Sequence, residues 1–316
     1  MIVFRDPAEV PAGFGPSVVA IGKFDGVHAG HRAVIRRLEE TAAESGARAV
    51  VVTFDRNPLA VLRPDRCPEN VVTVERKLEL LSGLGLDAAL VLTFDEQMAA
   101  RSAEDFVAEI LVGALGVSTV LVGEDFRFGH GGAGTPDLLR AMGPQLGFTV
   151  EVVDDVYLAG SGRRVSSTWI RELLIEGDVT TAAEALGRNV DVRGEVVHGL
   201  KRGRELGFPT ANLSAAVDSF VPADGVYAGW LVDHDTGIRH RSAISVGTNP
   251  TFDDVLVRQV EAHVIGETEL DLYGHDVTVE FVERLRGMVA FEGIEKLMQQ
   301  MAQDVEDAAR VLAAQA

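Results

Sequence analysis

The chain has 316 residues, of which 47% are hydrophobic and 24% charged, so it is long enough for two globular domains and unlike a disordered or fibrous protein. Its net charge of −19 argues against nucleic acid as a partner, and its single cysteine, Cys67, excludes an internal disulfide framework. The N-terminal residues do not resemble a signal peptide, and the apolar runs are too short to span a membrane. We therefore expect a cytoplasmic protein with no membrane partner, and a homo-oligomer is left open.

Strand-like and helix-like segments alternate in the first part of the chain. Short apolar runs rich in β-branched residues occur at 17–21, 48–54, 88–93, 118–122 and 149–153. Amphipathic stretches separate them, at 31–45, 73–84, 102–115 and 135–146. Apolar runs without strict alternation are typical of strands buried on both faces of a parallel sheet. The pattern predicts a doubly wound α/β domain over residues 1–186, with ligands at the carboxyl ends of its strands.

The pattern changes after Gly187. Segments of β type lie at 190–197, 225–232, 243–246, 257–264 and 276–281, separated by turns rich in Gly, Pro, Asp and Asn. No helix is expected among them until the amphipathic stretch 291–314. Clustered strands without crossover helices indicate an antiparallel barrel or sandwich, so residues 187–316 are predicted to form a second domain.

The first predicted strand runs into the segment GKFDGVHAGH, residues 22–31, and a helix follows. The N–H groups and the positive dipole end of a helix N-terminus bind phosphate oxygens, and Gly26 and Gly30 allow close backbone approach. His28 and His31 can donate to the phosphates of a nucleotide and stabilise a leaving pyrophosphate. The alternative interpretation is a pair of surface histidines in a tight turn.

Two further loops are expected at strand ends. Residues 122–134 contain FRFG and then a GxGxxG string, but this follows the fourth strand, so a loop around a mononucleotide is favoured over a dinucleotide fingerprint. Residues 165–171, VSSTWIR, read as a hydroxyl-rich helix start with Arg171 one turn in, suited to bidentate phosphate contact. Taken alone, this second motif is an ordinary helix cap.

The second half carries a different set of polar residues. In GRELGFPTANL, residues 203–213, Thr210 and Asn212 are neutral oxygen donors that share one face of an extended chain, which suits Mg²⁺. A polar turn explains the same segment equally well. Glu261 stands in an apolar strand and, from the residues alone, is a solvated side chain. No GxxxxGK[ST] motif occurs, so any kinase here is not of the P-loop type.

These motifs together resemble the bacterial bifunctional riboflavin kinase/FMN adenylyltransferase family, the prokaryotic FAD synthetases. The matching pieces are FDGVHAGH (24–31), FRFG (126–129), SSTWIR (166–171), GRELGFPTANL (203–213), PADGVYAG (222–229), SVGTNPTF (245–252), VEAH (260–263), DLYG (271–274) and FVERLRG (281–287). The resemblance covers nearly the whole chain. It implies an HxGH nucleotidyltransferase domain followed by a six-stranded antiparallel kinase barrel with a C-terminal helix.

The resemblance also implies the chemistry: ATP phosphorylates riboflavin to FMN, and a second ATP adenylylates FMN to FAD. His28 and His31 would then catalyse adenylyl transfer, and Glu261 would be the base of the kinase step. The implied ATP-binding residues of the adenylyltransferase are Gly22, Phe24, Asp25, Gly26, Gly30, Asp125, Phe128, Gly129, Ser166, Ser167, Thr168 and Arg171. The implied ATP- and flavin-binding residues of the kinase are Gly203, Arg204, Gly207, Phe208, Pro209, Thr210, Asn212 and Arg286, with Mg²⁺ held by Thr210 and Asn212.

The chain departs from the family pattern at two places. Residues 53–58 read TFDRNP where the family commonly has TFDPHP, so Asn57 replaces a histidine of the adenylyl-transfer site and Arg56 a proline. Asn189 and Val190 follow Gly187-Arg188 where the family has proline and an aromatic residue, a change expected to bear on packing. We expect Arg56 to compensate in part for Asn57, so that adenylyl transfer is slower than the kinase step.

Three alternatives are weighed against this interpretation. A riboflavin kinase with a weak or silent adenylyltransferase domain is favoured by Asn57. A flavin-binding regulatory protein without turnover is disfavoured because both histidines, Thr210, Asn212 and Glu261 are all present. Another nucleotidyltransferase of the HxGH class leaves everything after residue 187 unexplained.

Overall fold

The computed structural model describes residues 1–199, 206–250, 256–267 and 270–314. By packing, the chain forms two compact units, Met1–Ser166 and Ser167–Ala316. In the described ranges, no helix combines the length and the apolar composition needed to cross a membrane.

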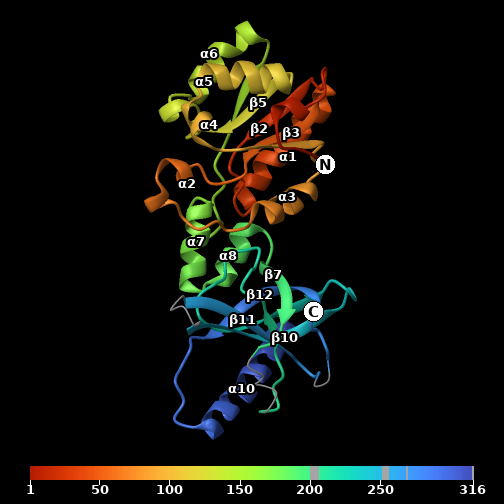
Figure 1. The fold of residues 1–316 in the computed structure, drawn as a ribbon, viewed down its shortest axis with the longest axis vertical. Coiled ribbons are helices and arrows are strands. Elements are labelled where there is room, and N and C mark those ends of the chain that lie inside the picture. Colours follow the sequence, from red (N-terminus) through yellow and green to blue (C-terminus); the bar gives the residue numbers. More distant parts are fainter. Residues whose placement is uncertain (200–205, 251–255, 268–269, 315–316) are drawn as a thin grey trace. The chain divides into compact units, whose positions relative to one another are not determined.

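The first unit is built on a six-stranded sheet in which neighbouring strands all run parallel (Figure 1). In spatial order the strands are β1 (Ile2–Phe4), β4 (Ala88–Leu92), β3 (Arg48–Phe54), β2 (Ser17–Ile21), β5 (Val117–Gly123) and β6 (Thr149–Val153). The five strands predicted from apolar runs are confirmed. The edge strand β1 was not predicted, because it has three residues and only Phe4 of them is buried.

Helices cover both faces of this sheet. They are α1 (Ala29–Ser45), α3 (Val74–Ser82), α5 (Ala103–Asp105) with a π-helical continuation (Phe106–Ala114), and α6 (Pro136–Leu146); α2 (Leu59–Leu62) and α4 (Glu96–Ala100) are short. Val18 of β2 packs into a core with α1 and α3, whereas its neighbour Val19 packs into a second core with α6 and the π-helix. Alternate residues of a strand thus face opposite layers, which confirms the doubly wound arrangement.

The strand order reverses at β2. The strands β3 and β4 lie on one side of β2, and β5 and β6 lie on the other. In open sheets of this kind, ligands bind where the strand order reverses, outside the carboxyl ends of the strands. The loops that follow β2 and β5 therefore border the expected ligand crevice of this unit.

The second unit contains a closed antiparallel barrel between helices (Figure 1). Around the barrel the strands are β10 (Arg239–Pro250), β11 (Leu256–Val264), β8 (Ala211–Leu213), β7 (Val190–Val197), β12 (Asp276–Arg286) and β9 (Gly225–Asp233). The barrel and its C-terminal helix α10 (Ile294–Ala313) confirm the predicted fold class. The three-residue strand β8 was not predicted as a strand, since it is too short to show an alternating pattern.

Two helices that precede the barrel pack against it. They are α7 (Ser167–Glu176) and α8 (Val179–Leu186). Arg284 donates to the Glu176 carbonyl at 2.9 Å, and Thr180 donates to the Val282 carbonyl at 3.2 Å. Packing therefore groups both helices with the barrel, while the boundary after Leu186, which rests on the change of strand and helix pattern in the sequence, stays a prediction about the functional domains.

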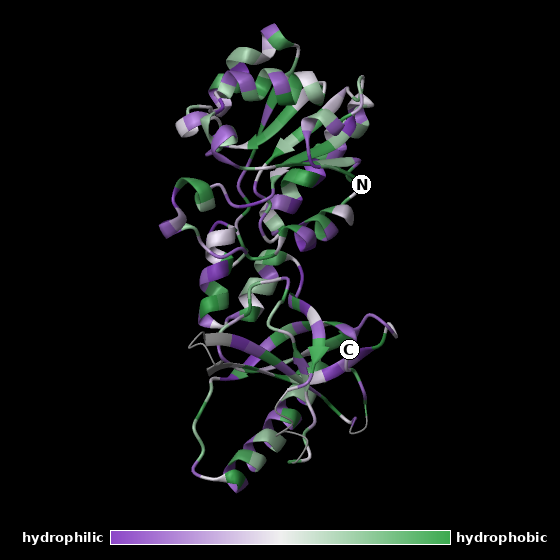
Figure 2. Ribbon diagram, in the orientation of Figure 1, coloured by the Kyte–Doolittle hydropathy of each residue, from purple (hydrophilic) through white to green (hydrophobic). Residues whose placement is uncertain are grey.

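The C-terminal helix α10 is amphipathic, with hydrophobic and hydrophilic residues in turn along its length (Figure 2). Its buried Ala308 and Leu312 pack with Ala228, Ala243 and Val282 of the barrel strands. This side of the helix closes a small core on the outside of the barrel.

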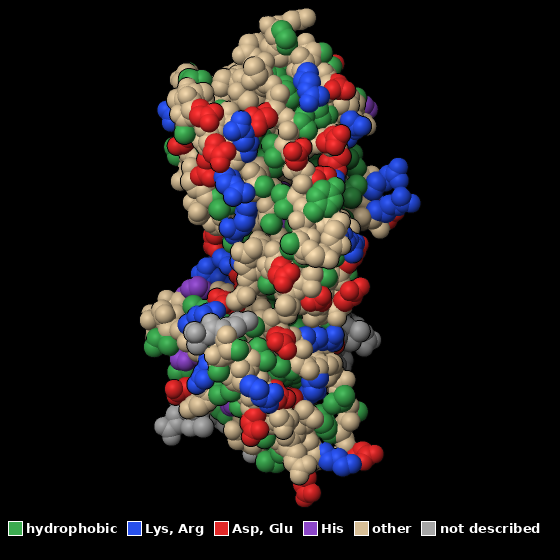
Figure 3. Space-filling view, turned by 180° about the vertical axis from the view of Figure 1, so that it is seen from behind, with side chains coloured by type: hydrophobic (Ala, Val, Ile, Leu, Met, Phe, Trp, Pro, Cys, Tyr) green, Lys and Arg blue, Asp and Glu red, His purple; other side chains and the backbone are tan. Residues whose placement is uncertain are grey.

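On the face shown in Figure 3, Lys and Arg side chains are scattered among acidic ones.

Candidate functional site

The loop between β2 and α1 brings the two predicted histidines together. His28 is the N-cap of α1, and its Nδ1 accepts a hydrogen bond from the His31 N–H at 3.3 Å. The two imidazole rings stack with their centroids 3.6 Å apart. Because Nδ1 of His28 is an acceptor, the proton of the neutral ring lies on Nε2. The helix start and the Nε2–H group together form a donor set for phosphate.

The side chain of the second histidine, His31, is only partly exposed to solvent. Burial, followed by the charges of His28, Lys23 and Lys77, holds the pKa of His31 well below its usual value. Its Nδ1 is buried and has no hydrogen-bond partner within the first unit, all of whose residues the structure describes. A buried polar atom without a partner is costly in a folded protein, so a bound ligand that satisfies it gains affinity.

The glycine between the histidines lies against the ring of His28. A Cβ atom at Gly30 would lie 3.2 Å from this imidazole ring. A larger residue would therefore require the His28 ring to shift by a few tenths of an ångström.

Two predicted residues of this region have structural partners. The Asp25 carboxylate accepts hydrogen bonds from the backbone N–H groups of Val71 and Val72, at 2.8 and 3.3 Å. It therefore fastens the loop after β2 to the segment that leads into α3. The Asp125 carboxylate accepts from Arg164 at 2.9 Å, which fastens the loop after β5 to a neighbouring hairpin. Their predicted roles in binding ATP stay predictions.

A large apolar pocket lies beside these loops. It has a volume of about 610 Å³, and its walls include Ile21 at the end of β2 and Phe54 at the end of β3. Phe126 and Phe128 line it too, with their rings stacked 5.5 Å apart. The GxGxxG string forms a short 3₁₀ turn in its wall (His130–Gly132). The pocket is large enough for a planar aromatic ligand.

The serine- and threonine-rich motif opens a helix, as predicted. Ser166 closes the first unit, and Ser167 and Thr168 form the first turn of α7 in the second. The Arg171 guanidinium lies 3.4 Å from the Thr168 hydroxyl, one turn into the helix. The motif therefore offers hydroxyls and a guanidinium on one stretch of helix.

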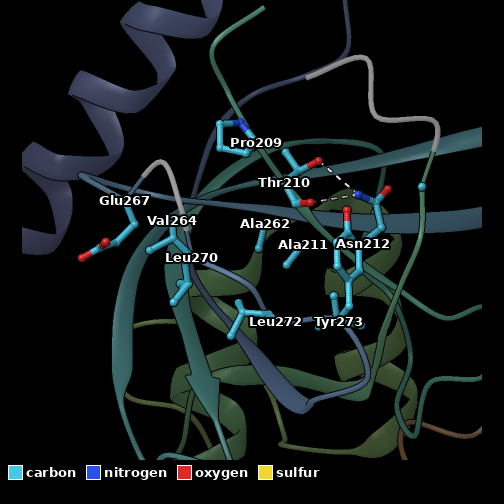
Figure 4. Close-up of a pocket in the computed structure, with 12 residues that line it drawn as sticks. Pro209, Thr210, Ala211, Asn212, Ala262, Val264, Glu267, Leu270, Leu272 and Tyr273 are labelled. Atoms are coloured by element: carbon cyan, nitrogen blue, oxygen red, sulfur yellow. Dashed lines mark hydrogen bonds between the residues drawn. The ribbon is translucent and has the colours of Figure 1, made fainter. Parts of the chain in front are cut away.

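Three residues predicted for the kinase meet in the barrel. Asn212 of β8 pairs directly with Glu261 of β11. The Thr210 hydroxyl donates to the Glu261 carboxylate at 3.2 Å and accepts from the Asn212 amide at 3.1 Å. Figure 4 shows Thr210 and Asn212 turned toward each other. The amide N–H of Asn212 is thus used within the site, which leaves its oxygen for a ligand.

The Glu261 side chain is partly buried. Burial raises the pKa of Glu261 above its usual value, and the hydrogen bond from Thr210 offsets part of that shift. From the residues alone we expected the Glu261 side chain to be solvated, and the structure does not agree with this expectation. A Cβ at Gly199 would lie 2.4 Å from the Asn212 oxygen, so only glycine fits beside this amide. Sequence reasoning did not find Gly199.

The remaining predicted kinase residues lie around this cluster. The Pro209 carbonyl accepts a hydrogen bond from Nδ1 of His263 at 2.8 Å, and Phe208 packs on the same ring. A pocket beside Thr210 is lined by Pro209, Asn212 and Tyr273 (Figure 4). Gly207 adjoins this segment, whereas Gly203 and Arg204 lie outside the described residues.

Arg286 is engaged by the C-terminal helix. Its guanidinium makes two hydrogen bonds to the buried Asp304 carboxylate, at 2.8 and 2.6 Å, and Gln300 donates to the same carboxylate. The guanidinium therefore holds α10 on β12. Its predicted contact with ATP or flavin stays a prediction.

Comparisons with known proteins agree for both units. The family model described as FAD synthetase matches residues 12–169, and the one described as riboflavin kinase matches residues 186–312. A curated bifunctional riboflavin kinase/FMN adenylyltransferase from Pseudomonas fluorescens is 39% identical over 298 residues, which are 94% of this chain and 93% of the relative. The enzyme of that name from Escherichia coli strain K12 is 33% identical over 290 residues, or 91% and 90%.

One solved structure is similar over almost the whole chain. Its title names a macrolide-efflux protein from Streptococcus pneumoniae, and it matches with a TM-score of 0.86 and 30% identity over 98% of each chain. The two matching family models and the curated relatives together cover both units described above. The chain belongs to the family of bifunctional riboflavin kinase/FMN adenylyltransferases.

Proposed function

We propose that this protein phosphorylates riboflavin to FMN and then transfers AMP from ATP to FMN, giving FAD and pyrophosphate. Membership of the family supports both reactions. The observation that carries the proposal is the presence of two separate residue groups in one chain: the stacked histidines of the sheet unit and the Thr210–Asn212–Glu261 cluster of the barrel.

For adenylyl transfer, a phosphate oxygen of FMN attacks the α-phosphorus of ATP and pyrophosphate leaves. The Nε2–H of His28 and the N-terminus of α1 donate to the phosphate oxygens on which negative charge develops. His31 stays neutral because burial lowers its pKa. Its ring N–H supplies a second hydrogen-bond donor without adding a positive charge to the site. The apolar pocket with Phe126 and Phe128 fits the isoalloxazine ring of FMN.

For the kinase step, the Glu261 carboxylate takes the proton from the ribityl 5′-hydroxyl as that oxygen attacks the γ-phosphorus of ATP and ADP leaves. Its raised pKa makes it a stronger base than an exposed glutamate. The hydrogen bond from Thr210 fixes the orientation of the carboxylate. Thr210 thus links the base to Asn212.

Mg²⁺ belongs to this proposal at the kinase site. Thr210 and Asn212 present neutral oxygens about the same pocket, and Mg²⁺ favours few protein ligands completed by water and phosphate oxygens. When bound, the ion offsets negative charge on the phosphates. Cytoplasmic location, the lack of a nucleic acid partner and the oligomeric state remain predictions from the sequence.

The proposal is tested by separating the products formed when the purified protein is incubated with riboflavin, ATP and Mg²⁺. We expect FMN first and FAD later. Formation of FMN alone would support the kinase-only alternative. Binding of riboflavin with no product would contradict the proposed function and favour a regulatory flavin-binding protein.

A further inference from the structure

One buried charge in the first unit has no part in the chemistry described so far. Lys77 of α3 is 6% exposed, and no other Lys, Arg, Asp or Glu of residues 1–166, all of which are described, is buried to this degree. A buried ammonium is expensive unless its donors are satisfied. Its position is therefore informative.

The donors of Lys77 are satisfied by oxygens at the carboxyl ends of β2 and β3. Its Nζ atom donates to the Phe54 carbonyl at 2.8 Å, to the Thr53 hydroxyl at 3.0 Å and to the Lys23 carbonyl at 3.3 Å. Thr53 itself donates to the Lys23 carbonyl at 3.1 Å. All three donors of the ammonium are used, so none is left for a phosphate.

The segment held in this way has a strained backbone. Between Lys23 and His28, the non-glycine residues Phe24 and Val27 have φ angles of 49° and 43°. Such conformations cost of order 1–3 kcal/mol each and persist only where the surroundings impose them. The hydrogen bonds of Lys77 and Thr53 to the Lys23 carbonyl act at the start of this segment, and the histidine pair lies at its end.

We propose that Lys77 is a positioning residue for adenylyl transfer: its ammonium clamps the ends of β2 and β3 so that the strained loop presents His28 and His31 to the phosphates. The same clamp fixes Phe54, which lines the apolar pocket and precedes Arg56 and Asn57. This inference rests on the proposed function of the first unit. It assigns Lys77 no contact with substrate.

The hydrogen bonds of the Lys77 ammonium should also depend on pH. Burial lowers the pKa of Lys77 to about 8, against the opposing effects of nearby carboxylates. The charged and titratable groups around it are Lys23, Asp25, His28 and His31 before or in α1, Asp55 and Arg56 after β3, and Glu75 of α3. The neutral amine formed above pH 8 has two donors for three oxygens, so the clamp weakens as the pH rises.

The test compares wild type, Lys77→Met and Thr53→Val in the full-length protein. FAD formation from FMN and ATP by the wild type tests the proposed function first. In Lys77→Met we expect kcat for adenylyl transfer to fall roughly 10- to 100-fold, the scale of a misplacement of catalytic groups by about 1 Å. Riboflavin phosphorylation in the same samples should be unchanged, and a far-UV circular dichroism spectrum identical to that of the wild type shows that the first unit is folded as well.

Two readouts separate positioning from simple stability. The ratio of wild-type to Lys77→Met adenylylation rates should shrink as the pH rises through about 8, since the wild type then loses its own clamp. Titration of groups remote from Lys77 cancels in this ratio, and His31 and Asp55, whose pKa values Lys77 helps to lower, are already deprotonated in the wild type above pH 7. Thr53→Val, which removes only the bridging hydroxyl, should lower kcat less than Lys77→Met, with little change in the KM for ATP.

Adenylylation at the wild-type rate in Lys77→Met would overturn the proposal. So would a wild-type to variant ratio that stays constant from pH 7 to pH 9.5. If Lys77→Met does not fold, the Thr53→Val variant decides: a wild-type kcat in a folded Thr53→Val protein contradicts the clamp.

Discussion

Asn57, where the chain departs from its family, has a local structural partner. Its side-chain oxygen accepts from the Leu59 N–H at 3.1 Å, so it forms a turn that leads into the short helix α2. The guanidinium of Arg56 is paired with the neighbouring Asp55 carboxylate, at 2.8 Å. Arg56 is more than half exposed. If Arg56 compensates in part for the histidine that is replaced by Asn57, it does so with a guanidinium charge that is already paired with Asp55 and hydrated.

The Asn57→His substitution should therefore raise the rate of FAD formation. A histidine donates from a ring nitrogen and carries a proton near pH 7, whereas an amide donates without charge. Arg56→Pro alone should lower the rate. The measurement is the initial rate of FAD formation from FMN, with FMN formation from riboflavin as the control. If both substitutions are silent, this loop lies outside the rate-limiting chemistry.

At Glu261 the structure predicts a pH dependence. A base must be deprotonated to act, and burial raises the pKa of this carboxyl, so kinase activity should be present above that raised pKa and lost as the pH falls through it. The acid limb of kcat should lie at higher pH than for an ordinary glutamate. Glu261→Gln should lower kcat roughly 10²- to 10⁴-fold and remove this limb while riboflavin still binds. A Gln variant with a near-wild-type rate would refute the assignment.

At the scale of elements, apolar runs and helix caps were enough to predict most of the fold. β2 and β3 fall where their runs predict, and Thr135 and Pro136 begin α6 as expected. The π-helical segment could not be predicted, because its buried residues follow a spacing that an α-helix also satisfies. Strands of three residues, such as β8, are too short for any periodic signal.

Site residues were predictable only where a motif names them. HxGH and PTAN led to the histidine pair and to Thr210 and Asn212, but Lys77 was missed. It occupies the apolar stripe of α3, whose buried residues are Lys77, Leu78 and Leu81. A charge on such a stripe was the one available signal. The role of Lys77 depends on the oxygen atoms at the ends of β2 and β3 that bind its ammonium group. The sequence does not show that these oxygens lie beside α3.

The contact of α10 with the barrel should depend on one buried ion pair. Asp304 is 5% exposed and binds Arg286 through both oxygens. We expect Asp304→Asn to lower the free energy of unfolding of the barrel by about 3 kcal/mol. This is the lower end of the range for removing one partner of a buried ion pair, and we choose it because part of Arg286 is exposed. Asp307→Asn is the matched control on the same helix, since its partner Arg310 is exposed. It should change stability by at most about 1 kcal/mol.

Denaturant unfolding followed by circular dichroism measures both variants. Equal effects of Asp304→Asn and Asp307→Asn would show that the Arg286–Asp304 pair does not anchor the helix.

At the scale of the whole molecule, the two units should be separable. A fragment of residues 187–316 contains the complete barrel and its cluster, so it should fold and phosphorylate riboflavin. A fragment of residues 167–316 keeps α7 and α8, whose hydrogen bonds reach Val282 and Arg284, and should be the more stable of the two. Thermal unfolding and kinase assays compare them. A soluble, flavin-binding barrel fragment without kinase activity would count against the division.

The central claim is that two separate residue groups in one chain perform two successive reactions. The most direct measurement is chromatography of the flavins formed by wild type, His31→Ala and Glu261→Gln, each given riboflavin or FMN with ATP and Mg²⁺. We predict that His31→Ala accumulates FMN without FAD. Glu261→Gln should form FMN from riboflavin at least about 10²-fold more slowly than the wild type but convert added FMN to FAD. A mixture of the two variants should convert riboflavin to FAD. Loss of both reactions in either folded variant would contradict the account.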